Sequence, residues 1–274
     1  MSITTRRATE QDKERCTWIE SFATPGLSYI NDVWEQFSNA PKGEFMVAEE
    51  DGIVGGFGMF SHLYGAYGWL EAGRVHPDFQ SRGMGKGFYT RFMEKMVEED
   101  ITAVGMYTGI KNAVSKGLAE RFGLSVQGEY EEFTKPLDPA AAAMHGFVPV
   151  SEAEGEALLA PHYAEMDAFA VLNRTFYPVR EGLGAGYARE GWMYKDDEGN
   201  LIVAGCRFQP DKALHIAFLK GDTDKLLTCA EALAAKQGAS GLTGMSANPA
   251  THKLFLDRGF TQGPGTFITL WKGL

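Results

Sequence analysis

A glycine-rich segment with two basic side chains follows a short apolar stretch, and this combination favours phosphate binding. Residues 68–75 are expected to form a strand that ends before Pro77, because proline cannot donate a hydrogen bond to a sheet. The sequence Gln-Ser-Arg-Gly-Met-Gly at residues 80–85 then leads into an expected helix from about Lys86. Backbone N–H groups at a helix N-terminus attract anions. Arg82 and Lys86 add donors suited to phosphate.

Two common phosphate-binding motifs do not fit this spacing. The dinucleotide fingerprint requires G-x-G-x-x-G, whereas the glycines here are Gly83, Gly85 and Gly87. The P-loop requires a glycine at the place of Gln80, and it requires serine or threonine after Lys86. Both motifs are therefore excluded.

The same segment resembles the acyl-CoA-binding signature of the GNAT N-acetyltransferase superfamily, V-x-P-x-x-(Q/R)-x-x-G-x-(G/A). Val75, Pro77, Gln80, Gly83 and Gly85 stand at the spacing of that signature. The resemblance implies direct transfer of an acetyl group from acetyl-CoA to an amine in a ternary complex. It also implies a fold in which two parallel strands splay apart beside the glycine loop.

The resemblance further implies which residues hold acetyl-CoA. Strand residues would contact the pantetheine arm through their backbone, and loop residues would hold the pyrophosphate: Gly73, Arg74 and Val75 in the strand, and Ser81, Arg82, Gly83, Met84, Gly85 and Lys86 in the loop. Residues 112–124 resemble a second family signature, in which Asn112 would also contact the arm. Asn112 fits the N-cap of a helix equally well, and the two roles are compatible.

Glu71 is the candidate general base. On a regular strand it lies on the same face as Gly73 and Val75, beside the expected thioester. A carboxylate there, buried enough to raise its pKa, could take the proton of the amine directly or through water. A solvated or ion-paired strand glutamate is an equally consistent interpretation.

The candidate general acid is harder to find. Family members often use a tyrosine to protonate the leaving thiolate, but the matching residue here is Ala119. Tyr107, on the neighbouring expected strand, is the nearest replacement, and Tyr130 is another. The alanine keeps a second hypothesis open, in which the chain is a non-catalytic CoA-binding sensor or interaction protein.

The second half of the chain looks like a degenerate repeat of the first. Residues 248–260 align with residues 112–124, but the loop between the expected strand 214–219 and its helix is short and contains Asp222, which would repel a pyrophosphate. We predict an α/β (α+β) chain with two tandem GNAT folds, each a mixed, mostly antiparallel sheet flanked by helices. The predicted divisions are a CoA-binding and catalytic domain at 1–135, a linker at 136–146 and a degenerate domain at 147–274.

Composition excludes several other classes of protein. A net charge of −10 argues against non-specific nucleic-acid binding, which requires a basic face. The three cysteines lack a C-x-x-C pair and the histidines lack metal-ligand spacing, so no metal is expected. The polar first residues and the lack of a long apolar run indicate neither a signal peptide nor a membrane span. We therefore expect a cytoplasmic protein, monomeric or homodimeric, whose partners are acetyl-CoA and an amine.

Overall fold

The chain folds into two compact units. The computed structural model describes residues 3–23, 28–137 and 146–273. The first unit comprises residues 1–127 together with residues 270–274, and the second comprises residues 128–269. The predicted linker falls largely on residues 138–145, which lie outside the described residues.

The first unit is built on a mixed sheet with the strand order β1-β2-β3-β4-β5, beside which lies the end of the C-terminal strand. Strands β1 to β4 are antiparallel to their neighbours, whereas β4 and β5 are parallel. The strands are β1 (Ile3–Arg7), β2 (Glu44–Glu50), β3 (Ile53–His62), β4 (Tyr67–Val75) and β5 (Ala103–Gly109). The helices are α1 (Lys13–Ala23), α2 (Ile30–Ser38), α3 (Met84–Glu98) and α4 (Ala113–Arg121).

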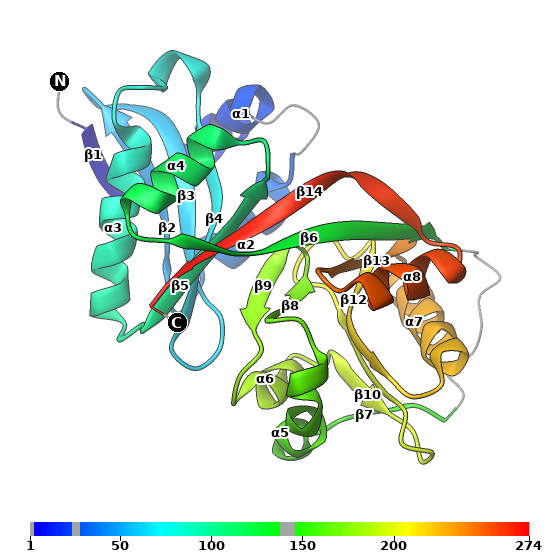
Figure 1. Ribbon diagram of the computed structural model, residues 1–274. Coiled ribbons are helices and arrows are strands. Elements are labelled where there is room, and N and C mark those ends of the chain that lie inside the picture. The colour runs from blue at the N-terminus through cyan, green and yellow to red at the C-terminus, as the bar shows by residue number, and fades with distance from the viewer. Residues whose placement is uncertain (1–2, 24–27, 138–145, 274) are drawn as a thin grey trace. The chain divides into compact units, whose positions relative to one another are not determined.

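Helices cover both faces of this sheet. On one face, α1 contacts β3 and β4, and the ring of Trp34 from α2 lies edge-on to Phe45 of β2, with centroids 5.1 Å apart. On the other face, α3 runs along β1 to β4, as Figure 1 shows. Glycines at 56 and 58 let it come close, because a Cβ atom at either position would lie 3.2 Å from the ring of Phe88 or Phe92.

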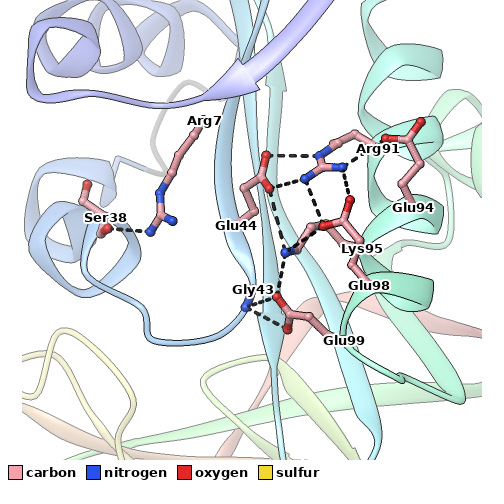
Figure 2. Close-up of polar contacts among 9 residues, drawn as sticks. All are labelled: Arg7, Ser38, Gly43, Glu44, Arg91, Glu94, Lys95, Glu98 and Glu99. Atoms are coloured by element: carbon pink, nitrogen blue, oxygen red, sulfur yellow. Dashed lines mark hydrogen bonds and ion pairs between the residues drawn. The ribbon is translucent and has the colours of Figure 1, made fainter.

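An ion-pair network fixes α3 against β2 (Figure 2). Arg91 of α3 donates to Glu44 of β2 at 2.6 Å and to Glu98 of its own helix at 2.6 Å. Lys95 lies 2.8 Å from Glu99, and the Glu99 carboxylate accepts the backbone N–H of Gly43 at 2.9 Å. The hydrogen bonds that Arg91 donates to Glu44 and Glu98 raise the pKa of Arg91, so the guanidinium stays charged at neutral pH. The network thereby fixes the orientation of the helix whose N-terminus follows the glycine loop.

The second unit contains a second mixed sheet. Its strand order is β14-β6-β13-β12-β11-β10-β7, and its parallel pair is β12 with β13. The strands are β6 (Ser125–Pro136), β7 (Val148–Pro149), β10 (Met193–Lys195), β11 (Leu201–Gly205), β12 (Leu214–Lys220), β13 (Gly241–Ser246) and β14 (Thr261–Lys272). Strand β14 contributes only its end, Leu270–Lys272, to the first unit.

Helices and a small hairpin cover the second sheet. The core on one face is formed by buried side chains of α7, among them Leu226 and Ala230, packed with Ile202 and Phe255. The covering elements are α5 (Glu152–Leu159), the hairpin β8 (Phe169–Leu172) and β9 (Thr175–Pro178), α6 (Leu183–Arg189), α7 (Thr223–Gln237) and α8 (Pro249–Asp257). The hairpin contacts β12 and β13.

The predicted fold class is confirmed: both sheets are mixed, mostly antiparallel and flanked by helices. Local signals explain the accuracy of the first half. Thr9 and Asp12 form a capping box, and Asp51 and Gly52 take the left-handed conformations (φ 50° and 80°) that a tight hairpin needs. The β8–β9 hairpin was not predicted, because its strands are only four residues long.

Candidate active site

The parallel strands β4 and β5 diverge at the candidate site. They pair only from Tyr67 to Trp69 and from Ala103 to Gly105, although β4 continues to Val75 and β5 to Gly109. Beyond the paired part, the facing edges of the two strands separate. This is the splayed pair of parallel strands that the sequence resemblance implies.

A β-bulge in β4 decides which side chains face the same way. Glu71 pairs with Met59 of β3, and Arg74 pairs with Phe57, so three steps along β4 match two along β3. Ala72, inside the bulge, has φ 55°, a conformation that is rare for a residue with a Cβ atom. Because Phe57 and Met59 lie on the same face of β3, Glu71 and Arg74 share one face of the sheet.

The expected common face of Glu71 and Val75 is therefore wrong. Val75 pairs with Gly56, which points to the α3 side of the sheet, whereas Glu71 points to the α1 and α2 side. The expectation assumed regular alternation, and the extra residue of the bulge reverses it.

Polar side chains gather on the α1 and α2 side of the strands. Ser61 of β3 donates a hydrogen bond to the carboxylate of Glu71, which is half-buried. Tyr107 of β5 is also half-buried, and its ring lies parallel to that of Trp69, with centroids 6.3 Å apart. The structure thus brings the two predicted catalytic residues to neighbouring strands on one face.

Two further groups on this face come from α1 and from the residue before α2. Burial raises the pKa of Tyr29, the residue before α2; the charge of Arg74 opposes this shift and that of Glu71 adds to it. The buried carboxylate of Glu20 accepts the backbone N–H groups of Tyr29 at 3.1 Å and Ile30 at 3.0 Å, and burial raises its pKa. Glu20 lies in α1 and belongs to no motif, and only the structure places its carboxylate beside β4.

The glycine loop leaves β4 through a 3₁₀ turn, Pro77–Phe79. Gln80 then donates from its side chain to the backbone carbonyl of Val75 at 3.3 Å, which ties the loop to the end of the strand. Ser81 and Gly83 both have positive φ, 63° and 100°. Such conformations turn successive N–H groups toward one side, where they can bind an anion.

Helix α3 begins with an uncapped N-terminus. Its N-cap residue is Gly83, and no side chain in the described part of the chain caps it. Lys86 in the first turn is exposed. Arg82, in contrast, lies 2.8 Å from Glu50, so part of its charge is already compensated. The backbone N–H groups of the first turn, more than the arginine, are therefore available to an anion.

Gly85 serves the packing of two helices. A Cβ atom on Gly85 would lie 2.8 Å from the side chain of Leu118 in α4. Asn112 caps α4 by accepting the backbone N–H of Ser115 at 3.1 Å, so its capping role is confirmed. Ala119 is fully buried. Tyr130, the other tyrosine considered, belongs to the second unit, where its ring contacts Phe176.

His76 is more enclosed than its place in a loop suggested. It is only 4% exposed, its ring stacks on Trp18 with centroids 4.2 Å apart, and its Nδ1 accepts the backbone N–H of Asp78 at 3.2 Å. The stack joins α1 to the start of the loop. His76 thus has a structural role that the sequence did not reveal.

The corresponding loop of the second unit is closed by its own side chains. Asp222 caps α7, and its carboxylate accepts the N–H groups of Asp224 at 3.0 Å and Lys225 at 3.3 Å. The side chain of Asn200 accepts the N–H of Asp222 at 2.6 Å. The first turn of α7 therefore already has a carboxylate where an anion would bind.

A cleft opens in the second unit where β12 and β13 diverge. Its volume is about 730 Å³, open to solvent, and Phe169 of β8, Phe218 of β12 and Leu254 of α8 line it. The nearby carboxylate of Asp167 accepts from the hydroxyl of Ser246 at 2.6 Å and the N–H of Ala247 at 2.9 Å. The cleft is thus walled by aromatic and aliphatic groups beside a carboxylate that already has partners.

The described residues contain no candidate metal site and no candidate membrane-spanning helix. Within residues 3–23, 28–137 and 146–273, no group of three or more His, Cys, Asp or Glu side chains is placed to hold a metal ion. None of the helices described in those ranges has the length and apolar character needed to span a membrane.

Comparison with known families and structures gives a consistent result. Residues 9–124 match the model of the acetyltransferase (GNAT) family. A search of curated proteins finds no match. Among solved structures, a GCN5-related N-acetyltransferase from Sphaerobacter thermophilus is 12% identical with a TM-score of 0.65, over 98% of this chain and 95% of that one.

Two other solved structures have a similar fold. A tandem GNAT protein from the clavulanic acid biosynthesis pathway is 11% identical with a TM-score of 0.59, over 99% of this chain and 98% of that one. A GCN5-related N-acetyltransferase from Kribbella flavida is 12% identical with a TM-score of 0.54, over 100% of this chain and 71% of that one. At these identities the likeness shows the fold alone.

Proposed function

We propose that the first unit transfers an acetyl group from acetyl-CoA directly to an amine, because residues 9–124 match the model of the acetyltransferase (GNAT) family. The observation that carries the proposal is the uncapped N-terminus of α3, which follows the glycine loop at the end of a splayed strand. The N-cap glycine has φ 100° and presents no side chain, so a phosphate can approach the first turn. These features fit the pyrophosphate of acetyl-CoA, and we propose Ser81 to Lys86 as its cradle.

The proposed reaction forms one bond and breaks one. The amine nitrogen attacks the thioester carbonyl, the new N–C bond forms, and the C–S bond breaks with release of the CoA thiolate. The nitrogen loses a proton, for which we propose Glu71 as the acceptor, directly or through water. Its hydrogen bond with Ser61 holds the carboxylate on the α1 and α2 face.

We propose Tyr107 as the group that protonates the leaving thiolate. It lies on the diverging part of β5, half-buried, with its ring parallel to that of Trp69. Replacement by phenylalanine keeps this stacking and removes only the hydroxyl. Tyr107→Phe should therefore lower kcat by about tenfold without changing acetyl-CoA binding, less than a positioned proton donor usually contributes, because a thiolate of low basicity can leave without assistance.

The second unit is proposed to support the first without binding acetyl-CoA in the same way. Its helix α7 is capped by Asp222, and the strand position two residues past the last parallel pair carries Phe218, where the first unit carries Glu71. The functional division into residues 1–135 and 147–274 is part of this proposal.

The test is thermal unfolding with and without acetyl-CoA, comparing the wild type with Gly83→Asp. The new carboxylate would occupy the first turn of α3, as Asp222 does in α7. At a hundred times its Kd, acetyl-CoA should stabilise the wild type by about 2.7 kcal/mol, since a ligand that binds only the folded state stabilises it. The variant should lose most of this gain.

Gly191→Asp is a matched control. Gly191 also has positive φ, 73°, with no atom within 4 Å of an added Cβ, but it lies in the second unit. Both variants suffer the same kind of backbone strain, and only Gly83→Asp should lose the response to acetyl-CoA. An equal response in all three proteins would refute the proposed cradle. Binding of acetyl-CoA without acetylation of any amine would favour the sensor hypothesis instead.

A further inference from the structure

We infer that the amine acceptor carries a carboxylate close to its nitrogen, and that Arg74 binds that carboxylate while Glu71 receives the amine proton. The substrate class is therefore an amino acid or a similar zwitterion. This inference rests on the proposed function and adds the chemistry of the second substrate. It depends on the partners of Arg74, on the bulge and on the neighbouring side chains.

Arg74 has fewer partners than its position demands. Its Nη1 donates at 3.1 Å to the backbone carbonyl of Gly73, the preceding residue. Its Nε is buried, and among the described residues it has no hydrogen-bond acceptor. A buried donor without an acceptor is costly, so this nitrogen is placed for a group that binds there.

Other arginines of the chain show the contrast. Arginines at 6, 82, 91, 174, 189 and 258 each have a carboxylate oxygen within 2.8 Å. Across the parts of the chain that the structure describes, no carboxylate lies within the 4.0 Å ion-pair distance of Arg74, although Glu20 and Arg74 interact at longer range. Arg7 and Arg15 also have no close carboxylate, but they donate to the backbone carbonyls of Ser38 and Val54, whereas the buried Nε of Arg74 has no acceptor among the described residues. A substrate carboxylate would complete it.

The bulge sets the spacing between the two groups. Glu71 and Arg74 face the same way, and their partners Met59 and Phe57 are two residues apart on β3. Their Cα atoms therefore lie roughly 6–7 Å apart along the sheet. Both side chains are long enough to converge on one small molecule, with the carboxylate accepting at its amine and the guanidinium donating to its carboxylate. Without the bulge, alternation would place the two on opposite faces.

The surroundings make this spot suited to a fixed, planar cation. The Arg74 guanidinium lies 5.8 Å from the centre of the Tyr29 ring, within cation–π range, which restrains its orientation. A restrained guanidinium offers two parallel N–H groups that match a carboxylate, whereas a lysine would offer a single point charge. Arg74 therefore selects for the shape as well as the charge of the ligand.

The experiment compares amines in matched pairs with and without the carboxylate. Phenylalanine is paired with phenethylamine, lysine with cadaverine and glutamate with 4-aminobutyrate, and the second member of each pair lacks the α-carboxylate. Release of the CoA thiol is the readout. The wild type should prefer the α-carboxylate member of at least one pair by about ten- to hundredfold in kcat/KM, the range expected for a charge-assisted pair of hydrogen bonds. Arg74→Gln should abolish this preference mainly through KM, and Arg74→Lys should keep part of it.

Binding gives a second readout that needs no turnover. 3-Phenylpropionate has the carboxylate and lacks the amine. In titration calorimetry it should bind to the wild type and not to Arg74→Gln. Arg189→Gln, an exposed arginine of the second unit, is the matched control and should behave as the wild type. An unchanged acetyl-CoA thermal shift in Arg74→Gln shows that the variant is folded.

The outcomes separate the two proposals. If amines are acetylated but carboxylates bring no preference, or if Arg74→Gln loses activity equally toward both members of each pair, the inference is wrong and the proposed function stands. If no amine of either kind is acetylated, the proposed function fails and this inference fails with it.

Discussion

Helices α3 and α7 occupy equivalent places in the two units, α3 after β4 and the glycine loop and α7 after β12 and a shorter loop, and their N-cap residues differ. Helix α3 starts at Gly83, which presents no side chain. Helix α7 starts at Asp222, whose carboxylate accepts two N–H groups of the first turn. The same backbone arrangement can thus bind an external anion or be satisfied internally, and one residue decides which.

The strands before these helices differ in the same direction. Trp69 and Ile216 pair with equivalent glycines of the parallel neighbours, Gly105 and Gly244. Two residues further on, the first unit has Glu71 and the second has Phe218. The second unit therefore also has diverging strands, but it has neither the open helix N-terminus nor the carboxylate. Under the proposed function, one chain would carry the same fold twice and the chemistry once.

The largest effect is expected from removing the carboxylate that the first unit has at this strand position and the second unit does not. Glu71→Gln keeps the size and the hydrogen bond with Ser61 but cannot accept a proton, so kcat should fall by about 10²- to 10⁴-fold. Steady-state release of CoA with an accepted amine measures this. Glu198→Gln, at an exposed position of the second unit, should leave the rate unchanged. Full activity in Glu71→Gln would show that Glu71 is not the general base.

Much of the first unit was predictable because its signals are local. The signature from Val75 to Gly85 depends on glycine and proline conformations that residue types reveal directly. Asn112 was identified as a helix cap for the same reason. The tandem architecture was also predictable, because residues 248–260 repeat the pattern of residues 112–124.

The faces of β4 were not predictable, because they depend on one extra residue. Alternation placed Glu71 with Val75, and the bulge at Ala72 placed it with Arg74. Alanine at φ 55° carries no sequence signal, since glycine is the residue expected there. The contribution of Glu20 was also missed, because this residue lies in a separate helix that only the tertiary fold brings to the strand.

The strand equivalent to β4 in the second unit carries a histidine where β4 has a glycine. Burial lowers the pKa of His215 in β12 from 6.5 to about 4, with the charge of Glu132 opposing this and that of Arg174 adding to it. By the strand pairing, the corresponding residue of β4 is Gly68. The unfolded state binds the proton first as the pH falls, so stability is unaffected above about pH 7 and is lost between about pH 6.5 and 4, by up to about 3 kcal/mol.

Chemical denaturation at a series of pH values tests this. The free energy of unfolding should decline below pH 6.5 more steeply in the wild type than in His215→Gln, which cannot take up the proton. The slopes are compared rather than the absolute stabilities, since the variant also loses packing. Parallel slopes would show that His215 does not carry the acid sensitivity.

Removing the internal cap of α7 tests whether Asp222 is what closes this helix N-terminus to anions. Asp222→Ala should lower the free energy of unfolding by about 1 kcal/mol, because two N–H groups lose their acceptor. Inorganic phosphate should then stabilise the variant more than the wild type, as the freed N–H groups bind an anion. Asp211→Ala, which removes an exposed carboxylate outside any helix N-terminus, is the control. Equal responses to phosphate would mean that the cap alone does not close the site.

The smallest expected effects concern the repeated helices α4 and α8, and here the comparison separates two roles of one residue. Asn112 accepts the N–H of Ser115 at 3.1 Å, and Asn248 accepts that of Ala250 at 2.9 Å, so Asn112→Ala and Asn248→Ala should each cost about 0.5–1 kcal/mol of stability. If Asn112 also contacts the pantetheine arm, its variant alone should weaken acetyl-CoA binding, by a few-fold in titration calorimetry. Asn112→Asp keeps the cap and changes the donor, so weakened binding without lost stability would assign the amide to the ligand. Unaltered affinity in both alanine variants would reduce Asn112 to the same structural role as Asn248, and the difference between the units would then lie in the strand and the glycine loop alone.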